Sequence, residues 1–168
     1  MKKIALAVCA LLITLSVLAQ QNPPAEKTNS PIIPVFHVLK VDSSGYFTNN
    51  DLKKHRETII MYFSPECDHC KHQTKDLLES MDQFKNVEIL MASYFSLKEI
   101  KEFYEKFEIA KYPNIKMGRD EQYKIPPNYN MHSFPFLALY DKKGKLVATF
   151  EGNQKPATLL DALKKSAD

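Results

Sequence analysis

The stretch TIIMYFSPECDHC, residues 58–70, decides the fold of this chain. Its first six residues form a continuous apolar run, which is typical of a central strand buried on both faces. Residues 64–66 (Ser-Pro-Glu) break the strand. A helix is expected to begin at Cys67 and to reach about Phe84, because large apolar side chains recur there at helical spacing. The stretch therefore predicts a buried strand that leads directly into a helix with two cysteines in its first turn.

The segments on either side alternate between strand and helix patterns. Ser96 is followed three residues later by Glu99, which predicts a capping box at a helix start. Residues 111–130 are rich in Pro and Asn and are interpreted as loop. The other expected elements are a hairpin over 35–41 and 46–48, a short helix over 49–55, strands over 87–92, 136–140 and 146–150, and a last helix from Pro156. This order indicates an α/β fold, with a central mixed sheet flanked by helices on both faces.

The N-terminus has the pattern of an export signal. Lys2 and Lys3 precede the apolar run from Ile4 to Leu18, which is short for the roughly 20 residues that a membrane-spanning helix needs. We therefore expect a signal peptide over residues 1–19, a flexible leader over 20–34 and one domain over 35–168. An uncleaved membrane anchor is the alternative. Once the signal is cleaved, no stable membrane span is expected.

Charge and composition exclude some classes of function. The chain has 168 residues and a formal net charge of +3, which falls to +1 when Lys2 and Lys3 are removed with the signal. A nearly neutral body gives no electrostatic reason to expect nucleic acid as a partner. Nothing in the sequence calls for an organic cofactor.

The cysteines point to chemistry rather than to a structural crosslink. Cleavage of the signal leaves only Cys67 and Cys70, which are separated by two residues along the chain. An exported chain meets an oxidising compartment, where disulfides persist. A disulfide stabilises more when it closes a longer loop, and this loop is very short. The pair is therefore expected to exchange thiols and disulfides or to bind a metal.

A dithiol exchanger needs a thiolate that attacks and a second thiol that resolves the mixed disulfide. Cys67, at the helix start, is predicted to attack because free N–H groups and the helix dipole favour a negative charge there. Cys70, one turn later and more buried, is predicted to resolve. His69 adds a donor or a positive charge that favours the thiolate of Cys67.

Metal binding is the alternative reading of the same residues. Zinc or copper could use Cys67 and Cys70 with His69 and His72. A copper-binding chaperone could use Cys67, Cys70 and His132. No second Cys-x-x-Cys or His pair stands at zinc-finger spacing, so we expect no metal centre.

Two motifs together resemble the thioredoxin-like superfamily. Residues 59–70 resemble its active-site strand and helix, and residues 133–141 (SFPFLALYD) resemble its cis-proline and following strand. The segment Phe36 to Leu52 looks like the start of exported TlpA-like and redoxin-type thiol-disulfide oxidoreductases. The interval of 65 residues from Cys70 to Pro135 leaves room for the extra helix of that branch.

The resemblance implies an activity and a place for it. Pro135 is expected to be cis and to face the cysteines, so that Phe134 offers its backbone to an extended substrate. The expected partners are cysteine-containing exported proteins and an unidentified redox partner, most plausibly in the periplasm. A peroxidase is a weaker alternative, since Ile60 stands where that motif has proline.

The sequence also departs from the family. Met61 and Gln73 occupy positions where relatives carry carboxylates that serve proton transfer at the resolving thiol. The absence of these carboxylates, together with His69, leaves the direction of electron flow open.

Overall fold

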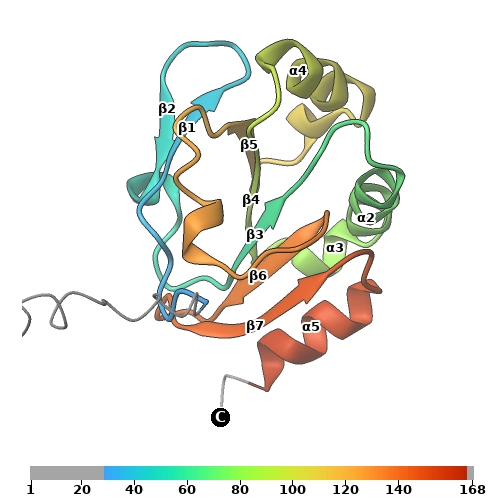
Figure 1. Cartoon of the computed structure of the whole chain (residues 1–168). Coiled ribbons are helices and arrows are strands. Elements are labelled where there is room, and N and C mark those ends of the chain that lie inside the picture. Colours follow the sequence, from blue (N-terminus) through green and yellow to red (C-terminus); the bar gives the residue numbers. More distant parts are fainter. Residues whose placement is uncertain (1–28, 166–168) are drawn as a thin grey trace, which may run out of the picture.

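The computed structural model describes residues 29–165, so the predicted signal peptide and most of the predicted leader lie outside the described residues. Figure 1 shows one sheet with its helices gathered on one side. The elements are β1 (His37–Lys40), β2 (Tyr46–Thr48), η1 (Asn49–Asp51), β3 (Thr58–Tyr62), α2 (Asp68–Glu79), α3 (Met81–Phe84), β4 (Glu88–Ser93), α4 (Leu97–Lys106), η2 (Ile109–Lys111), β5 (Ile115–Arg119), η3 (Pro126–Asn128), β6 (Phe136–Tyr140), β7 (Leu146–Glu151) and α5 (Pro156–Lys164).

The sheet has seven strands in the order β2-β1-β5-β4-β3-β6-β7. β3 pairs in parallel with β4 and antiparallel with β6, which confirms a mixed sheet. All five residues of β3 are buried, as its continuous apolar sequence predicts for a strand covered on both faces. The N-terminal hairpin is present as β1 and β2.

The α-helices cover one face of the sheet, whereas the sequence indicated helices on both. β3, β4 and β5 follow one another in the same direction across the sheet. Right-handed crossovers between parallel strands then place every connecting helix on the same side. Apolar residues of α2, α3, α4 and α5 accordingly share one core with the helix-facing side chains of the strands. α4 is the additional helix expected between Cys70 and Pro135.

Among residues 29–165, no α-helix covers the opposite face. Its core consists of strand residues such as Ile60 and Tyr62, together with Phe36 near the start of the domain and Ile125 and Tyr129 from the segment around η3. The hydroxyl groups of Tyr129 and Tyr140 lie 2.6 Å apart and hydrogen-bond inside this core. The apolar residues of an irregular segment thus replace a second helical layer.

β5 is a strand that the sequence reading missed, because residues 111–130 were expected to be loop. It pairs in parallel with β4 and antiparallel with β1. Gly118 allows this close packing, since a Cβ there would lie 2.1 Å from the backbone oxygen of Leu39. A five-residue strand between loop-forming residues gives little local signal, and its partners are far away in the sequence.

Other boundaries differ by small amounts. The long helix expected to reach Phe84 is interrupted at Ser80, so it forms α2 and α3. The short helix expected over 49–55 is only the 3-10 turn η1. The capping box of Ser96 and Glu99 is confirmed, since each residue's side chain accepts from the other's backbone N–H.

The chain contacts the domain before residue 35, the expected boundary of the leader. The backbone N–H of Ser30 donates to the oxygen of Asn128 at 2.8 Å, and that of Ile33 donates to the oxygen of Gly144 at 3.1 Å. Within residues 29–165, no helix has both the length and the apolar character needed to cross a membrane.

Candidate active site

The two cysteines lie at the start of α2, just after the short segment that joins it to β3. Cys67 is the N-cap of α2 and has extended backbone angles, and its side chain makes no capping hydrogen bond. Its side chain is partly exposed, whereas that of Cys70 is fully buried. Both thiols are free. The first turn of the helix thus presents one thiol to solvent and keeps the other behind it, as the sequence predicts.

Cys70 is held as a neutral thiol. Burial raises the pKa of Cys70 well above its usual value, and the neighbouring thiol of Cys67 raises it further. A hydrogen bond from the backbone of Ser64 acts in the opposite direction but does not offset the burial. Cys70 therefore needs a proton acceptor, or a rise in pH, before it can attack a disulfide.

The loop before β6 lies directly over Cys67. The peptide bond between Phe134 and Pro135 is cis, as the resemblance implies. The thiol of Cys67 donates to the backbone oxygen of Phe134 at 3.8 Å. The N–H of Phe134 has no hydrogen-bond partner among residues 29–165. The structure thus brings Cys67, Cys70, Phe134 and Pro135 together.

Glu151, at the end of β7, fixes this loop from the outer side. Its carboxylate accepts from the backbone N–H of His132 at 2.7 Å and from the hydroxyl of Ser133 at 2.9 Å. The backbone N–H of Gly152 donates to the oxygen of Pro135 at 2.9 Å. The sequence reading did not identify this role for Glu151.

The two positions that lack carboxylates are both buried. Met61 belongs to the apolar core beside Cys70. The side chain of Gln73 donates to the backbone oxygen of Gln154 at 3.1 Å and accepts from the backbone N–H of Gln154 at 2.6 Å. Gln73 therefore joins α2 to the loop before α5. An amide can make both bonds at once, whereas a carboxylate could only accept.

Lys71 is a charged neighbour of the thiols that the sequence reading missed. Its ammonium group lies 2.9 Å from a carboxylate oxygen of Asp68 and donates to the backbone oxygen of Glu66 at 3.0 Å. The pair with Asp68 raises the pKa of Lys71, and the nearby charges of Cys67 and Glu66 contribute less. The sequence does carry a signal for this ion pair, because Asp68 and Lys71 have the i, i+3 spacing that brings two side chains together on a helix. His69 is exposed on the same turn.

Aromatic side chains lie beside the loop that contains Phe134 and Pro135, on the face of the sheet away from the α-helices. The ring centroid of Tyr94 lies 6.3 Å from that of Phe134 and 5.7 Å from that of Tyr123. Tyr94 is 42% exposed and Tyr123 is 52% exposed. A hollow of about 250 Å³ adjoins them. It is lined by Tyr123, Pro126, Pro127, Tyr129, Met131, His132, Ser133 and Phe134.

The structure does not assemble the donors that metal binding would need. Among residues 29–165, no three side chains of His, Cys, Asp or Glu are grouped closely enough to hold a metal ion. His132 lines the hollow beside Phe134 and does not join Cys67 and Cys70 in such a group. The donor set proposed for a copper chaperone therefore does not fit this arrangement.

The family that describes thioredoxin-like domains matches residues 49–167, which is more than two thirds of the chain. The chain therefore belongs to the thioredoxin-like domain family. No curated protein matches it significantly.

Solved structures share this fold at low sequence identity. A putative thioredoxin from Neisseria meningitidis has a TM-score of 0.65 at 16% identity, over 83% of this chain and 91% of that one. An exposed lipoprotein thioredoxin from Streptococcus pneumoniae has a TM-score of 0.64 at 23% identity, over 78% and 98%. A secreted disulfide oxidoreductase from Mycobacterium tuberculosis has a TM-score of 0.63 at 15% identity, over 77% and 95%. At these identities the likeness concerns the fold.

Proposed function

We propose that this protein is an exported thiol-disulfide oxidoreductase that exchanges electrons with cysteines of other envelope proteins. One observation carries the proposal: a partly exposed Cys67 at a helix start faces the cis-proline loop, with the buried thiol of Cys70 behind it. An accessible nucleophile and a protected resolving thiol are what two-step exchange needs.

The exchange proceeds in two balanced steps. In the reducing direction, the thiolate of Cys67 attacks a substrate disulfide, forms a mixed disulfide and releases one substrate sulfur as a thiolate, which takes up a proton. Cys70 then loses its proton and attacks the sulfur of Cys67. This second step releases the other substrate thiol and leaves a disulfide between Cys67 and Cys70. The substrate gains two electrons that the dithiol loses, and oxidation of a substrate is the reverse.

The surroundings of Cys67 suit a polypeptide substrate. The N–H of Phe134 has no hydrogen-bond partner among residues 29–165, and the carbonyl of the same residue meets the thiol of Cys67. An extended chain can therefore pair with the backbone there. The exposed rings of Tyr94 and Tyr123 and the hollow of about 250 Å³ offer apolar contact beside it. This volume lies below the ~300–1,000 Å³ of small-molecule sites and suits a single side chain.

Lys71 and His69 favour the thiolate of Cys67 in this proposal. Lys71 is fixed by Asp68 at 2.9 Å, and His69 lies on the same exposed turn. Positive groups beside a helix N-terminus stabilise a negative sulfur. The choice of Cys67 over Cys70 as the attacking thiol rests on exposure, because burial raises the pKa of Cys70 and keeps it protonated.

Export is supported by the N-terminal sequence. Lys2, Lys3 and the apolar run from Ile4 to Leu18 precede a site after Ala19 that suits signal cleavage. Solved structures of similar fold include proteins described as secreted and as an exposed lipoprotein. N-terminal sequencing of the protein from the envelope fraction is expected to begin at Gln20, and a chain that begins at Met1 in the cytoplasm would contradict export.

Reduction of insulin disulfides by dithiothreitol tests the activity. The wild-type protein is expected to accelerate the reaction, and Cys67→Ser is expected to leave only the rate of dithiothreitol alone. Retained activity in Cys67→Ser would contradict the mechanism. His72→Asn serves as a control on the same helix, because His72 is exposed and has no part in the exchange.

The reduction potential of the cysteine pair decides the direction of electron flow. A value near −270 mV would place the pair with reductants, and a value near −120 mV would place it with oxidants. Equilibration with glutathione buffers, followed by mass spectrometry of the alkylated protein, measures it.

A further inference from the structure

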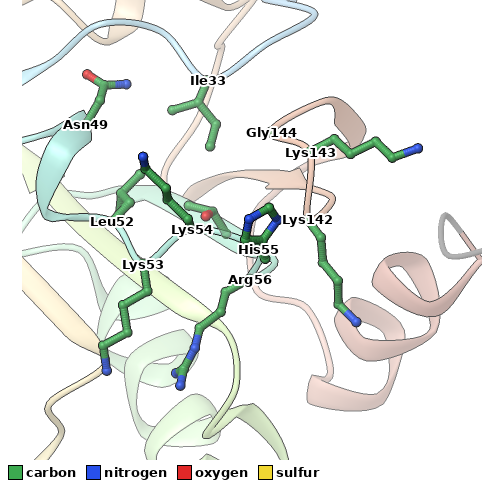
Figure 2. A pocket seen from close by; sticks show the side chains of 11 residues that line it. Ile33, Asn49, Leu52, Lys53, Lys54, His55, Arg56, Lys142, Lys143 and Gly144 are labelled. Atoms are coloured by element: carbon green, nitrogen blue, oxygen red, sulfur yellow. The ribbon is translucent and has the colours of Figure 1, made fainter.

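A basic pocket lies at the opposite end of β3 from the cysteines. Thr58, the first residue of β3, lines it, whereas Tyr62 ends the strand on the side of Cys67. Its volume is about 380 Å³. The pocket is lined by Ile33, Asn49, Leu52, Lys53, Lys54, His55, Arg56, Thr58, Lys142, Lys143 and Gly144. Figure 2 shows that the basic side chains come from two segments, residues 53–56 and residues 142–143, which lie side by side at the pocket.

Most of the positive charge in this pocket is uncompensated. Arg56 lies 3.5 Å from Glu88, and Lys142 lies 3.4 Å from Glu57. Within residues 29–165, the side chains of Lys53, Lys54 and Lys143 have no acidic partner. The nearby carboxylate of Asp141 accepts from the backbone N–H groups of residues 143 and 145. Three lysines without an acidic partner among residues 29–165 therefore stand at the rim of one hollow, and Figure 2 shows the side chains of Lys53 and Lys143 extending outward from it.

Exposed apolar side chains flank the pocket where the chain joins the domain. Ile32 is 64% exposed and Val35 is 75% exposed, and Ile33, between them, lines the pocket. Ile32 forms an isolated bridge with Lys145, an exposed residue beside the turn between β6 and β7.

We propose that this end of the molecule binds the surface of a membrane that contains anionic lipids. The lysines around the pocket take phosphate headgroups, and Ile32 and Val35 enter the boundary between headgroups and acyl chains. Clustered lysines beside exposed apolar groups fit such a surface, because each lysine near it adds attraction. A nucleic acid would leave the two apolar side chains without a role. Since the cysteines lie at the other end of β3, Cys67 faces away from the membrane.

Co-sedimentation of the mature chain, residues 20–168, with vesicles tests this proposal. The measured quantity is the ratio of partition coefficients on vesicles with 30% phosphatidylglycerol and on vesicles of pure phosphatidylcholine. The test variant combines Lys53→Gln, Lys54→Gln and Lys143→Gln. The control variant removes the same charge from α4 with Lys98→Gln, Lys101→Gln and Lys106→Gln. Residues 20–28 are identical in all three proteins, so differences between the variants report on the pocket.

The proposal predicts a ratio that falls at least ~20-fold in the test variant, because each lysine near an anionic surface contributes roughly 1 kcal/mol. The control variant is expected to keep a ratio within ~3-fold of wild type. Insulin reduction is expected to be equal in all three proteins. An equal ratio in wild type and test variant would overturn the proposal. So would a loss of equal size in the control, or binding of DNA or inorganic phosphate in place of the vesicles.

Discussion

The two ends of β3 carry different surfaces. At its carboxyl end lie the cysteines, the cis-proline loop and a group of exposed aromatic rings. At its amino end lies the basic pocket, with three lysines that lack acidic partners among residues 29–165. The first surface has the accessible thiol and unpaired backbone that exchange with a polypeptide needs. The second has charge and exposed aliphatic groups, and no cysteine is among the residues that line it.

The two proposals thus assign thiol-disulfide exchange and membrane binding to separate surfaces of one domain. The strand between them is buried along its whole length, and neither surface contributes residues to the other. Changes at one end are therefore expected to leave the other unaffected, because distant sites without shared contacts act independently.

Removal of the attacking thiol has the largest expected effect. Cys67→Ser is expected to abolish insulin reduction and to leave the vesicle ratio unchanged, since the basic pocket contains no part of the cysteine end. Both assays are run on one preparation. A changed vesicle ratio in this variant would show that the two ends are coupled.

Gln73→Glu is expected to lower the free energy of unfolding by roughly 1–3 kcal/mol, the cost of leaving a buried polar group unsatisfied. The carboxylate loses the bond that Gln73 donates to the oxygen of Gln154. Burial raises the pKa of such a carboxyl, so the destabilisation relative to wild type is expected to grow as the pH rises through that folded-state pKa. Urea unfolding at pH 4 and pH 8 measures it.

The same Gln73→Glu variant is expected to resolve mixed disulfides faster, because its carboxylate can accept the proton of Cys70. Stopped-flow measurement of the second exchange step separates this gain from the loss of stability. Gln154→Ala is the matched control, since it changes the same loop without adding an acid. Equal acceleration in the control would contradict the role of the carboxylate.

The reduced protein is expected to lose stability in the alkaline range through Cys70. Burial raises the folded-state pKa of Cys70 above its usual value of 9.0. The contribution of Cys70 to stability is therefore fully present below about pH 9 and is lost as the pH rises through the folded-state pKa. Melting temperatures between pH 8 and 10.5 measure the loss. Cys70→Ala is expected to show a shallower decline than wild type, and an equal decline would contradict the burial effect.

Phe134→Ala is expected to lower kcat/KM about 10-fold for a polypeptide disulfide, the loss typical of a buried aromatic contact. A small disulfide, which does not reach the aromatic group, is expected to react at nearly the wild-type rate. Tyr46→Ala removes an aromatic ring from the other edge of the sheet and serves as control. An equal loss for both substrates would mean that Phe134 affects the reactivity of the Cys67 thiol and not contact with the polypeptide.

His69→Asn has the smallest expected effect. Loss of a positive or donating group near the helix start is expected to make the reduction potential about 10–20 mV more negative. His72→Asn, five residues after Cys67 and so farther from the attacking thiol along the helix than His69, is expected to change it less. A shift of the same size in both variants would mean that His69 has no specific effect on the reduction potential.

The parts of the fold that the sequence predicts are those with a strong local signal. β3 is a continuous apolar run, and the capping box of Ser96 and Glu99 specifies the start of α4. The cysteine pair and Pro135 are short motifs, and the structure brings them together as the resemblance implies. Local patterns of this kind are retained because tertiary packing agrees with them.

The missed features depend on contacts between distant segments. β5 exists because Ile89 and Leu39 pair with it from either side, which no local pattern shows. The basic pocket combines residues 53–56 with residues 142–143, so neither segment alone predicts it. The placement of the α-helices on one face follows from the strand order and the handedness of crossovers. That order cannot be read from the sequence of any single strand.

Trapping of the mixed disulfide tests the central claim most directly. Cys70→Ser and Cys67→Ser are each incubated with a peptide that contains one disulfide, and the products are identified by mass spectrometry. The account predicts that Cys70→Ser accumulates a peptide adduct on Cys67, while Cys67→Ser forms almost none because Cys70 is buried and protonated. An adduct on Cys70 in Cys67→Ser, formed as fast as the adduct on Cys67, would contradict it.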